Sequence, residues 1–190
     1  MQQLAIFASG GGSNARKIME YFNDNPDVRV ALVISNKKTA PVLEIAGSHG
    51  IPTLVIDRAM FYETEELLGI LTQHRIDFIA LAGFLWLIPP YLVGAYKGRM
   101  VNIHPALLPK YGGKGMYGHH VHEAVKAAGE TETGLTIHFV NAEYDEGAIV
   151  FQARCPVDPA DTPEIIAAKV LALEHRHYPE VLAGLLAGSR

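Results

Sequence analysis

The regular alternation of short apolar runs with amphipathic segments constrains the fold of this chain more than any other feature. The apolar runs of the first half are rich in β-branched residues and have the length of strands buried on both faces. Between them, apolar residues recur with the spacing of one helix face, as at Ile18, Met19 and Phe22. Alternating strands and helices form βαβ units, so we predict an α/β fold with an open, mostly parallel twisted sheet and helices on both faces. The predicted strands are 4–8, 28–34, 52–56 and 77–81, and the predicted helices after the first are 41–49 and 61–74.

The second half of the chain is expected to add antiparallel strands toward the C-terminal half. Apolar runs at 135–140 and 148–153 flank a polar loop at 141–147, a pattern typical of a hairpin. A long helix is expected over 161–187, and Pro179 should kink or break it. The other predicted elements are a short helix at 89–96, a strand at 99–103 and a helix at 119–128.

Composition and charge narrow the class of protein. The 190 residues include 16 basic and 20 acidic side chains, and the net charge of -4 disfavours nucleic acid as a partner. A single cysteine excludes an intrachain disulfide, and no apolar run is long enough to span a bilayer. The first residues lack the basic leader of a signal peptide. We therefore expect one domain, 1–190, in the cytoplasm, without a membrane partner.

A glycine-rich loop follows the first predicted strand. Residues 10–12 are all glycine and precede Ser13 and Asn14, where a helix should begin. Glycines let the backbone approach an anion and a helix N-terminus offers free N–H groups, so the loop predicts a phosphate site. A tight turn that binds nothing is the alternative, but a turn does not need the hydroxyl and the amide. The pattern also fits a dinucleotide fingerprint, yet 35–38 lacks the carboxylate that NAD requires, while NADP would tolerate a base there.

A second cluster of polar residues lies at the end of the predicted strand 99–103. Asn102 and His104 flank Ile103, so they share one face of the strand at the carboxyl edge, where α/β sheets bind ligands. An amide can donate to a developing oxyanion, and an imidazole can exchange a proton near neutral pH. Asp145 is the candidate carboxylate that would raise the pKa of His104 and hold its tautomer.

Each of these residues also has an ordinary structural explanation. Asn102 could cap a strand end, His104 could be a hydrogen-bonded core histidine, and Asp145 could be a turn residue. The combination favours catalysis by direct transfer, because the sequence contains no nucleophile elbow. His138, two residues after Thr136 on the same strand face, would support the site or merely pack.

Two further segments have weaker signals. The apolar stretch 84–87 could wall a flat aromatic ligand or belong to the core. His119, His120 and His122 suggest zinc, but they lack the i, i+4 spacing of paired ligands, and no Cys or Glu completes a set. We therefore expect solvent-facing or capping histidines and no metal.

Taken together, these residues resemble the folate-dependent phosphoribosylglycinamide formyltransferases along nearly the whole chain. The segment 102–111, with its Asn-x-His-Pro start and Leu-Leu-Pro continuation, is specific to the formyltransferase superfamily. The glycine loop followed by Ser13 and Asn14 is typical of the glycinamide ribonucleotide branch. The matching stretches are 9–14, 82–84, 102–111, 134–140, 145–147, 174–175 and 178–179.

The resemblance implies a Rossmann-like formyltransferase fold and a reaction. The formyl group of 10-formyltetrahydrofolate would pass to the amine of 5'-phosphoribosylglycinamide, giving formylglycinamide ribonucleotide and tetrahydrofolate in purine (IMP) synthesis. Asn102 and His104 would stabilise the tetrahedral intermediate, while Asp145 would keep His104 charged and order a water that shuttles protons. The implied binding residues are Gly12, Ser13 and Asn14 for the phosphate, Glu174 for the ribose, and Leu85, Trp86, Leu87, Ile88 and Asn102 with the 141–147 backbone for the folate.

The chain also departs from the family pattern. Relatives carry Met-Arg-Ile-Leu where this chain has 85–88, so Trp86 could pack on the aminobenzoyl ring in place of an arginine that anchors the folate tail. The loop 112–118 is longer than in many relatives. Leu171 stands where some relatives have a lysine near the phosphate.

Other functions remain as alternatives. A sugar-nucleotide N-formyltransferase would fit the Ser13-Asn14 loop less well, and a nucleotide- or folate-binding sensor would not require Asn102, His104 and Asp145 together. Methionyl-tRNA formyltransferases and formyltetrahydrofolate hydrolases carry an extra domain, which does not fit in 190 residues. An analogue that uses formate and ATP is disfavoured because the sequence shows no ATP-binding domain. We expect small-molecule substrates, with the chain acting as a monomer or homodimer.

Overall fold

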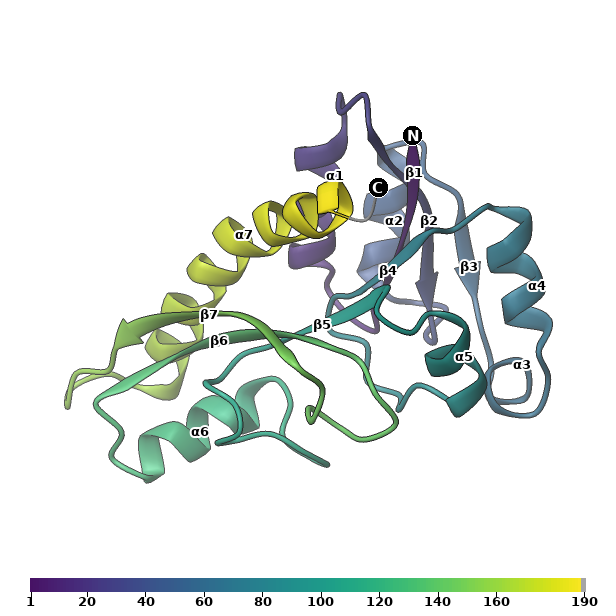
Figure 1. Cartoon of the computed structure of the whole chain (residues 1–190). Helices are drawn as coiled ribbons and strands as arrows, with labels where there is room; N and C mark the ends of the chain where they lie inside the picture. Colours follow the sequence, from purple (N-terminus) through teal and green to yellow (C-terminus); the bar gives the residue numbers. More distant parts are fainter. Residues whose placement is uncertain (189–190) are drawn as a thin grey trace.

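One mixed sheet organises the chain. The computed structural model describes residues 1–188, and the last two residues of the expected 1–190 domain lie outside the described part. The seven strands are hydrogen-bonded in the order β3-β2-β1-β4-β5-β6-β7 (Figure 1). The strands are β1 (Gln2–Phe7), β2 (Val28–Ser35), β3 (Thr53–Val55), β4 (Phe78–Leu81), β5 (Met100–His104), β6 (Glu132–Phe139) and β7 (Ile149–Pro156). The helices are α1 (Ser13–Phe22), α2 (Pro41–Ser48), α3 (Arg58–Tyr62), α4 (Glu66–Gln73), α5 (Pro90–Ala95), α6 (His119–Ala127) and α7 (Pro163–Gly188).

Strand direction in the sheet confirms the predicted fold class. β1 pairs in parallel with both β2 and β4, β2 with β3, and β4 with β5. β6 runs antiparallel to β5 and to β7, as the hairpin pattern predicted. The chain moves from β1 toward β3 and then returns to the other side of β1, so the order reverses between β1 and β4. Ligands of open α/β sheets bind at the carboxyl ends of the strands beside such a reversal.

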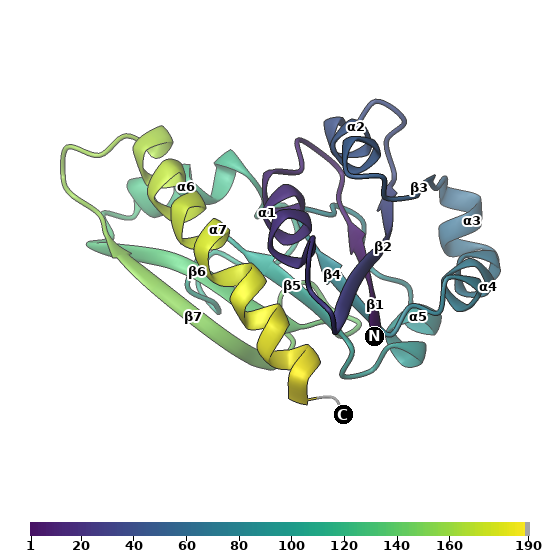
Figure 2. The same cartoon turned by 90° about the horizontal axis from the view of Figure 1, so that it is seen from above.

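Two hydrophobic cores cover the two faces of the sheet. On β1, Leu4 and Ile6 belong to the core that also contains residues of α1, α2 and α7, whereas Ala5 and Phe7 belong to the core beneath α3, α4 and α5. Figure 2 shows α1 and α7 crossing one face, with α3, α4 and α5 gathered away from them. Strands buried on both faces are therefore continuous apolar runs, which is the signal that the sequence carries.

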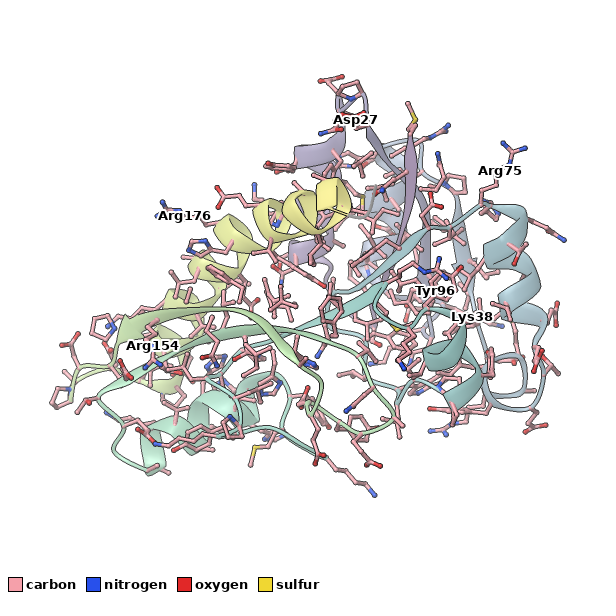
Figure 3. All side chains as sticks on the ribbon, in the orientation of Figure 1. Asp27, Lys38, Arg75, Tyr96, Arg154 and Arg176 are labelled. Carbon is pink, nitrogen blue, oxygen red and sulfur yellow. The ribbon has the colours of Figure 1, made fainter. Side chains whose placement is uncertain are left out.

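Charged side chains such as Arg75 and Arg176 are exposed and point away from the body of the molecule (Figure 3). Within residues 1–188, no helix combines the length and the apolar character that crossing a membrane requires.

The structure corrects two of the predicted helices. The segment 61–74 is not one helix, because α3 ends at Tyr62 and α4 begins at Glu66. The hydroxyl of Thr64 accepts the N–H of Glu66 at 3.3 Å, and such local bonds compete with a continuous helix. Of the kink or break predicted at Pro179, the break is wrong, since α7 continues through this residue. Tyr178, fully buried, donates its hydroxyl to the Leu81 carbonyl at 2.9 Å, so tertiary packing holds this part of the helix in place.

Candidate active site

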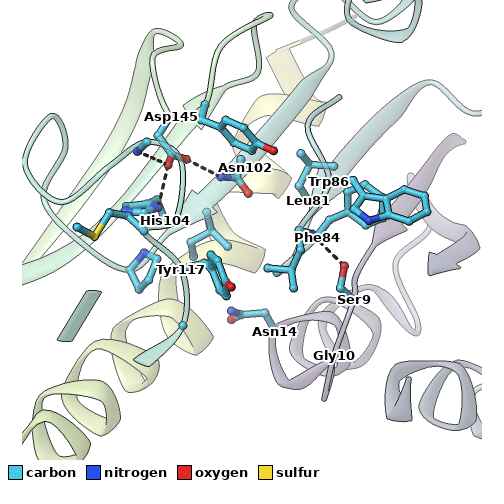
Figure 4. A pocket seen from close by; sticks show the side chains of 18 of the residues that line it. Ser9, Gly10, Asn14, Leu81, Phe84, Trp86, Asn102, His104, Tyr117 and Asp145 are labelled. Carbon is cyan, nitrogen blue, oxygen red and sulfur yellow. Dashed lines mark hydrogen bonds and ion pairs between the residues drawn. The ribbon is translucent and has the colours of Figure 1, made fainter. Parts of the chain in front are cut away.

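A large cavity opens where the carboxyl ends of β1, β4 and β5 meet. Its volume is about 850 Å³, and three groups of predicted site residues face it from different parts of the chain (Figure 4). Asn102 and His104 come from β5, Asn14 from the start of α1, and Trp86 from the segment after β4. The cavity therefore lies at the reversal of strand order, where the topology predicts a ligand-binding site.

The polar cluster at β5 forms as predicted. Asp145 reaches it from the loop between β6 and β7, and its Oδ2 lies 3.4 Å from Nδ1 of His104. Nδ2 of Asn102 donates to the other carboxylate oxygen, Oδ1, at 3.3 Å. His138, beside Asn102 on β6, places Nε2 3.4 Å from the same oxygen. One carboxylate thus contacts two imidazoles and one amide, which is more than a turn residue requires.

Backbone groups hold Asp145 in this position. The N–H of Gly113 donates to Oδ2 at 3.0 Å, so the 112–118 loop and the 141–147 loop meet at the carboxylate. Position 112 leaves no room for a side chain, because a Cβ on Gly112 would lie 2.5 Å from the Leu108 side chain and 3.3 Å from Cβ of Asp145. Asp145 itself has a φ of 57°, a left-handed conformation that Asp and Asn tolerate better than most residues.

Backbone carbonyls define the protonation of the two imidazoles. A carbonyl can only accept, and the Tyr111 carbonyl lies 2.7 Å from Nε2 of His104. A neutral His104 therefore carries its proton on Nε2 and has its basic nitrogen, Nδ1, facing Asp145. The Phe139 carbonyl, 2.9 Å from Nδ1 of His138, similarly leaves Nε2 of that ring as an acceptor for Asn102 at 3.2 Å.

These contacts differ from the sequence prediction in two respects. Burial lowers the pKa of His104, and this effect outweighs the raising effect of Asp145, so the expectation of a raised pKa is wrong. Burial alone would raise the pKa of Asp145, but its contacts with His138, His104 and Gly113 lower it overall. In addition, both amide hydrogens of Asn102 are directed at His138 and Asp145, so the free protein does not present the expected donor to the cavity.

The glycine loop lies at another side of the cavity. Gly12 has a φ of 73°, and a Cβ there would lie 2.6 Å from the Val42 side chain, so this turn requires glycine. Asn14 lines the cavity and donates through Nδ2 to Oε2 of Glu174 at 2.7 Å, which joins two predicted substrate residues. Burial raises the pKa of Glu174, against the lowering effect of Asn14.

Not every residue of the predicted phosphate site borders this cavity. Ser9, Gly10, Asn14 and Glu174 line it, whereas Gly12 and Ser13 do not. Lys37, which the sequence did not link to the phosphate site, lines it as well. Its loop is held against the glycine loop, since the N–H of Val42 donates to the Gly10 carbonyl at 3.3 Å.

The apolar segment after β4 forms the third side of the cavity. All four folate residues predicted in this segment, 85–88, line the cavity, together with Phe84. The N–H of Leu85 donates to the Ser9 hydroxyl at 2.9 Å, which ties this segment to the end of β1. Trp86 packs against Phe61, with ring centroids 5.5 Å apart, and the guanidinium of Arg58 stands 5.2 Å from the centre of the Trp86 ring. Arg58 was not predicted from the sequence, because its proximity depends on the packing of α3 against this segment.

His138 and Thr136, the two residues predicted to support the site, have different positions. His138 lines the cavity, but Thr136 is fully buried and does not. The Thr136 hydroxyl accepts the N–H of Leu108 at 3.0 Å and donates to the Ala106 carbonyl at 2.7 Å. Thr136 therefore shapes the loop that follows His104.

The histidines of α6 are only partly as predicted. His119 and His120 are exposed, but His122 is buried and lines the cavity, so its predicted solvent-facing position is wrong. The signal was present, since His122 precedes buried Val125 by three residues and so shares its inward face. In the described part of the chain, no three His, Cys, Asp or Glu side chains form a group that could hold a metal ion.

This fold and this site define a formyl transferase, and the family of that description matches residues 2–182. A relative named phosphoribosylglycinamide formyltransferase, chloroplastic, from Arabidopsis thaliana is 47% identical over 97% of this chain, which spans 65% of the relative's length. Phosphoribosylglycinamide formyltransferase of Bacillus subtilis is 35% identical over 98% of this chain and 95% of its own. The crystal structure of glycinamide ribonucleotide transformylase 1 from Symbiobacterium toebii superposes with a TM-score of 0.89 at 34% identity, covering 99% of this chain and 89% of that one. The chain belongs to the phosphoribosylglycinamide formyltransferase family.

Proposed function

We propose that the protein transfers the formyl group of 10-formyltetrahydrofolate to the amine of 5'-phosphoribosylglycinamide, yielding formylglycinamide ribonucleotide and tetrahydrofolate in purine synthesis. One observation carries the proposal: a polar cluster of Asn102, His104 and Asp145 shares one cavity with an aromatic wall and a glycine-rich helix start. Membership in the family supports it. A binding protein would need the wall and the helix start, but not the cluster.

The cavity has separate surfaces for the two substrates. The flat pterin ring packs on the apolar side chains of 85–88, next to Asn102, as buried aromatic ligands do on apolar walls. The ribonucleotide occupies the side with Asn14 and Glu174, where its phosphate meets the start of α1 and its ribose meets Glu174. Lys37 supplies the positive charge for the phosphate, a role that exposed Leu171 cannot fill.

The reaction joins the two substrates directly. The substrate amine attacks the formyl carbon, a C–N bond forms, and the carbonyl oxygen becomes an oxyanion. His104 takes the proton that the amine releases at Nδ1, where Asp145 stabilises the new positive charge. The bond from the formyl carbon to N10 of the folate then breaks, and N10 receives a proton through the same pair.

Asn102 stabilises the oxyanion by exchanging one of its present hydrogen bonds for the substrate. Its bonds to His138 and Asp145 are 3.2 and 3.3 Å long, at the weak end of the range for such bonds. Catalytic hydrogen bonds are often long without substrate and tighten when it binds. The exchange therefore costs little in comparison with the charge that it stabilises.

Arg58 and Trp86 anchor the acidic tail of the folate. Among residues 1–188, no carboxylate pairs with Arg58, whose guanidinium is stacked over Trp86, a residue that lines the cavity. A stacked guanidinium with free N–H groups suits a carboxylate ligand. The pair replaces the arginine that relatives carry at the position of Trp86.

The proposal also includes the domain organisation, the location and the partners of the protein. Residues 1–190 act as one domain on two small molecules in the cytoplasm, as a monomer or homodimer, without metal, nucleic acid or membrane. The single sheet with its two cores supports the one-domain assignment.

The test follows deformylation of the folate by absorbance with three acceptors: 5'-phosphoribosylglycinamide, an amino-sugar nucleotide, and none. Folate consumption that requires 5'-phosphoribosylglycinamide is the expected result. Consumption without an acceptor would identify a hydrolase, consumption with the sugar nucleotide alone would identify a sugar N-formyltransferase, and no consumption would leave a sensor. Each of these last three results would overturn the proposal.

A further inference from the structure

His122 is a buried polar side chain without an assigned role. It lies in the first half of α6, retains 6% exposure and lines the cavity. Its Nδ1 is sealed from solvent, and within residues 1–188 it has no hydrogen-bond partner. Buried polar groups in folded proteins are almost always paired, so an unpaired nitrogen in a ring that lines a cavity indicates a ring that turns toward a partner when a ligand binds.

The surroundings of His122 define the chemistry of that partner. Burial lowers the pKa of its ring first, and the neighbouring His119 and His104 lower it further. A neutral imidazole has one N–H and one lone pair, so it can both donate and accept. An amide offers both an N–H and a carbonyl, so it can pair with whichever of the two His122 presents, whereas a phosphate pairs only with the N–H and an ammonium only with the lone pair.

The place of His122 in the fold identifies which amide it meets. His104 is near enough to perturb it electrostatically, and α6 packs against α7, the helix that carries Glu174. The side chains of Ala167 and Val170, also on α7, line the same cavity and offer no hydrogen bond. The ring thus borders the space that a ribonucleotide must cross from Glu174 to the reacting carbon, and the glycinamide arm occupies that space.

We infer that His122 is a substrate-binding residue that hydrogen-bonds the amide of the glycinamide arm and thereby selects an acceptor of this length and polarity. The inference rests on the proposed function. It concerns the acceptor alone, because the folate binds the opposite, apolar wall.

Substitutions of His122 distinguish a role in substrate binding from a role in packing. His122→Leu keeps an apolar side chain of similar size but removes both nitrogens, and His122→Gln restores one donor and one acceptor. For His122→Leu we expect KM for the ribonucleotide to rise ~5- to 10-fold, the worth of one neutral hydrogen bond. kcat should change less than ~3-fold and KM for the folate should stay unchanged, because the inferred bond holds the acceptor equally before and during the reaction and does not involve the folate. His122→Gln should recover most of the ribonucleotide KM, and His120→Leu, on the exposed face of the same helix, should match the wild type.

A second measurement observes the wild-type protein itself. Ring ¹⁵N resonances of the wild-type protein are recorded with and without saturating 5'-phosphoribosylglycinamide, and that of His122 is assigned by its absence in His122→Gln. A shift of the His122 nitrogens is expected, and unchanged resonances would overturn the inference.

The outcomes distinguish the inference from the function on which it rests. An active wild type with an unchanged ribonucleotide KM in His122→Leu would overturn the role of His122 alone. A His122→Leu protein with a raised folate KM would do the same, since it would indicate a general distortion of the cavity. An inactive wild type would instead refute the proposed function.

Discussion

Replacing Asp145 by Asn tests the electrostatic core of the proposed mechanism. The substitution removes the negative charge but keeps the size of the side chain, and Asn tolerates the φ of 57° at this position. It weakens the interaction of Oδ2 with Nδ1 of His104, 3.4 Å away, which becomes an ion pair only when His104 takes up a proton. The variant should therefore fold normally and fail during the chemical step.

The magnitude follows from the distance. Two unit charges 3.4 Å apart attract by about 5 kcal/mol at an effective dielectric constant of 20. The side chain of Asp145 keeps 10% exposure, so solvent screens part of this attraction. We expect kcat to fall ~10²- to 10³-fold, equivalent to about 2.7 to 4.1 kcal/mol of lost transition-state stabilisation.

The assay measures kcat at saturating folate and ribonucleotide, together with the melting temperature of each protein. Glu146→Gln is the matched control, because it removes a neighbouring exposed charge that does not line the cavity, and it should retain kcat within ~2-fold. If Asp145→Asn kept more than half of the wild-type kcat, the reasoning on His104 and Asp145 would be refuted.

Three further predictions follow from the same geometry. Because burial lowers the pKa of His104, the neutral base persists below its ordinary pKa of about 6.5, so kcat/KM should fall only as pH drops below that value; a kcat/KM profile with its acid limb above 6.5 would contradict this. Arg58→Gln should raise KM for the folate roughly 3- to 10-fold with kcat unchanged, and a truncated folate without its glutamate should not distinguish the variant from the wild type. Gly12→Ala should lower the free energy of unfolding by about 1–3 kcal/mol in urea titrations, because φ is 73° and the new Cβ would meet Val42; an unchanged midpoint would show that the loop can move away.

The fold was predictable from the sequence because its signals are local. Continuous apolar strands, the α1 stripe of Ile18, Met19 and Phe22, and the hairpin at 135–153 each depend on residues close in sequence. The errors occurred where local chemistry or tertiary packing changed the outcome. Thr64 interrupts a pattern that reads as one helix, and the packing around Tyr178 holds α7 together at a proline.

The site was predictable in part for the same reason. Strand alternation placed Asn102 and His104 together, but the contact with Asp145 spans more than forty residues and was inferred from chemistry. Arg58 gave no signal, because an arginine in an exposed segment is ordinary until the fold brings it to Trp86. The segment 35–38, which contains Lys37, was related by its sequence only to a dinucleotide and not to the phosphate site. The direction of the His104 pKa shift was missed because burial, which outweighs the nearby carboxylate, cannot be measured from residue spacing.

Transfer of an isotopic label tests the central claim most directly. 10-Formyltetrahydrofolate carrying ¹³C in its formyl group is incubated with 5'-phosphoribosylglycinamide and either wild-type protein or His104→Ala, and the products are examined by ¹³C NMR. The proposed function predicts that the label appears in an amide of the ribonucleotide, at a rate at least ~10²-fold lower in His104→Ala. Label released as free formate, or transferred equally fast by the variant, would contradict it.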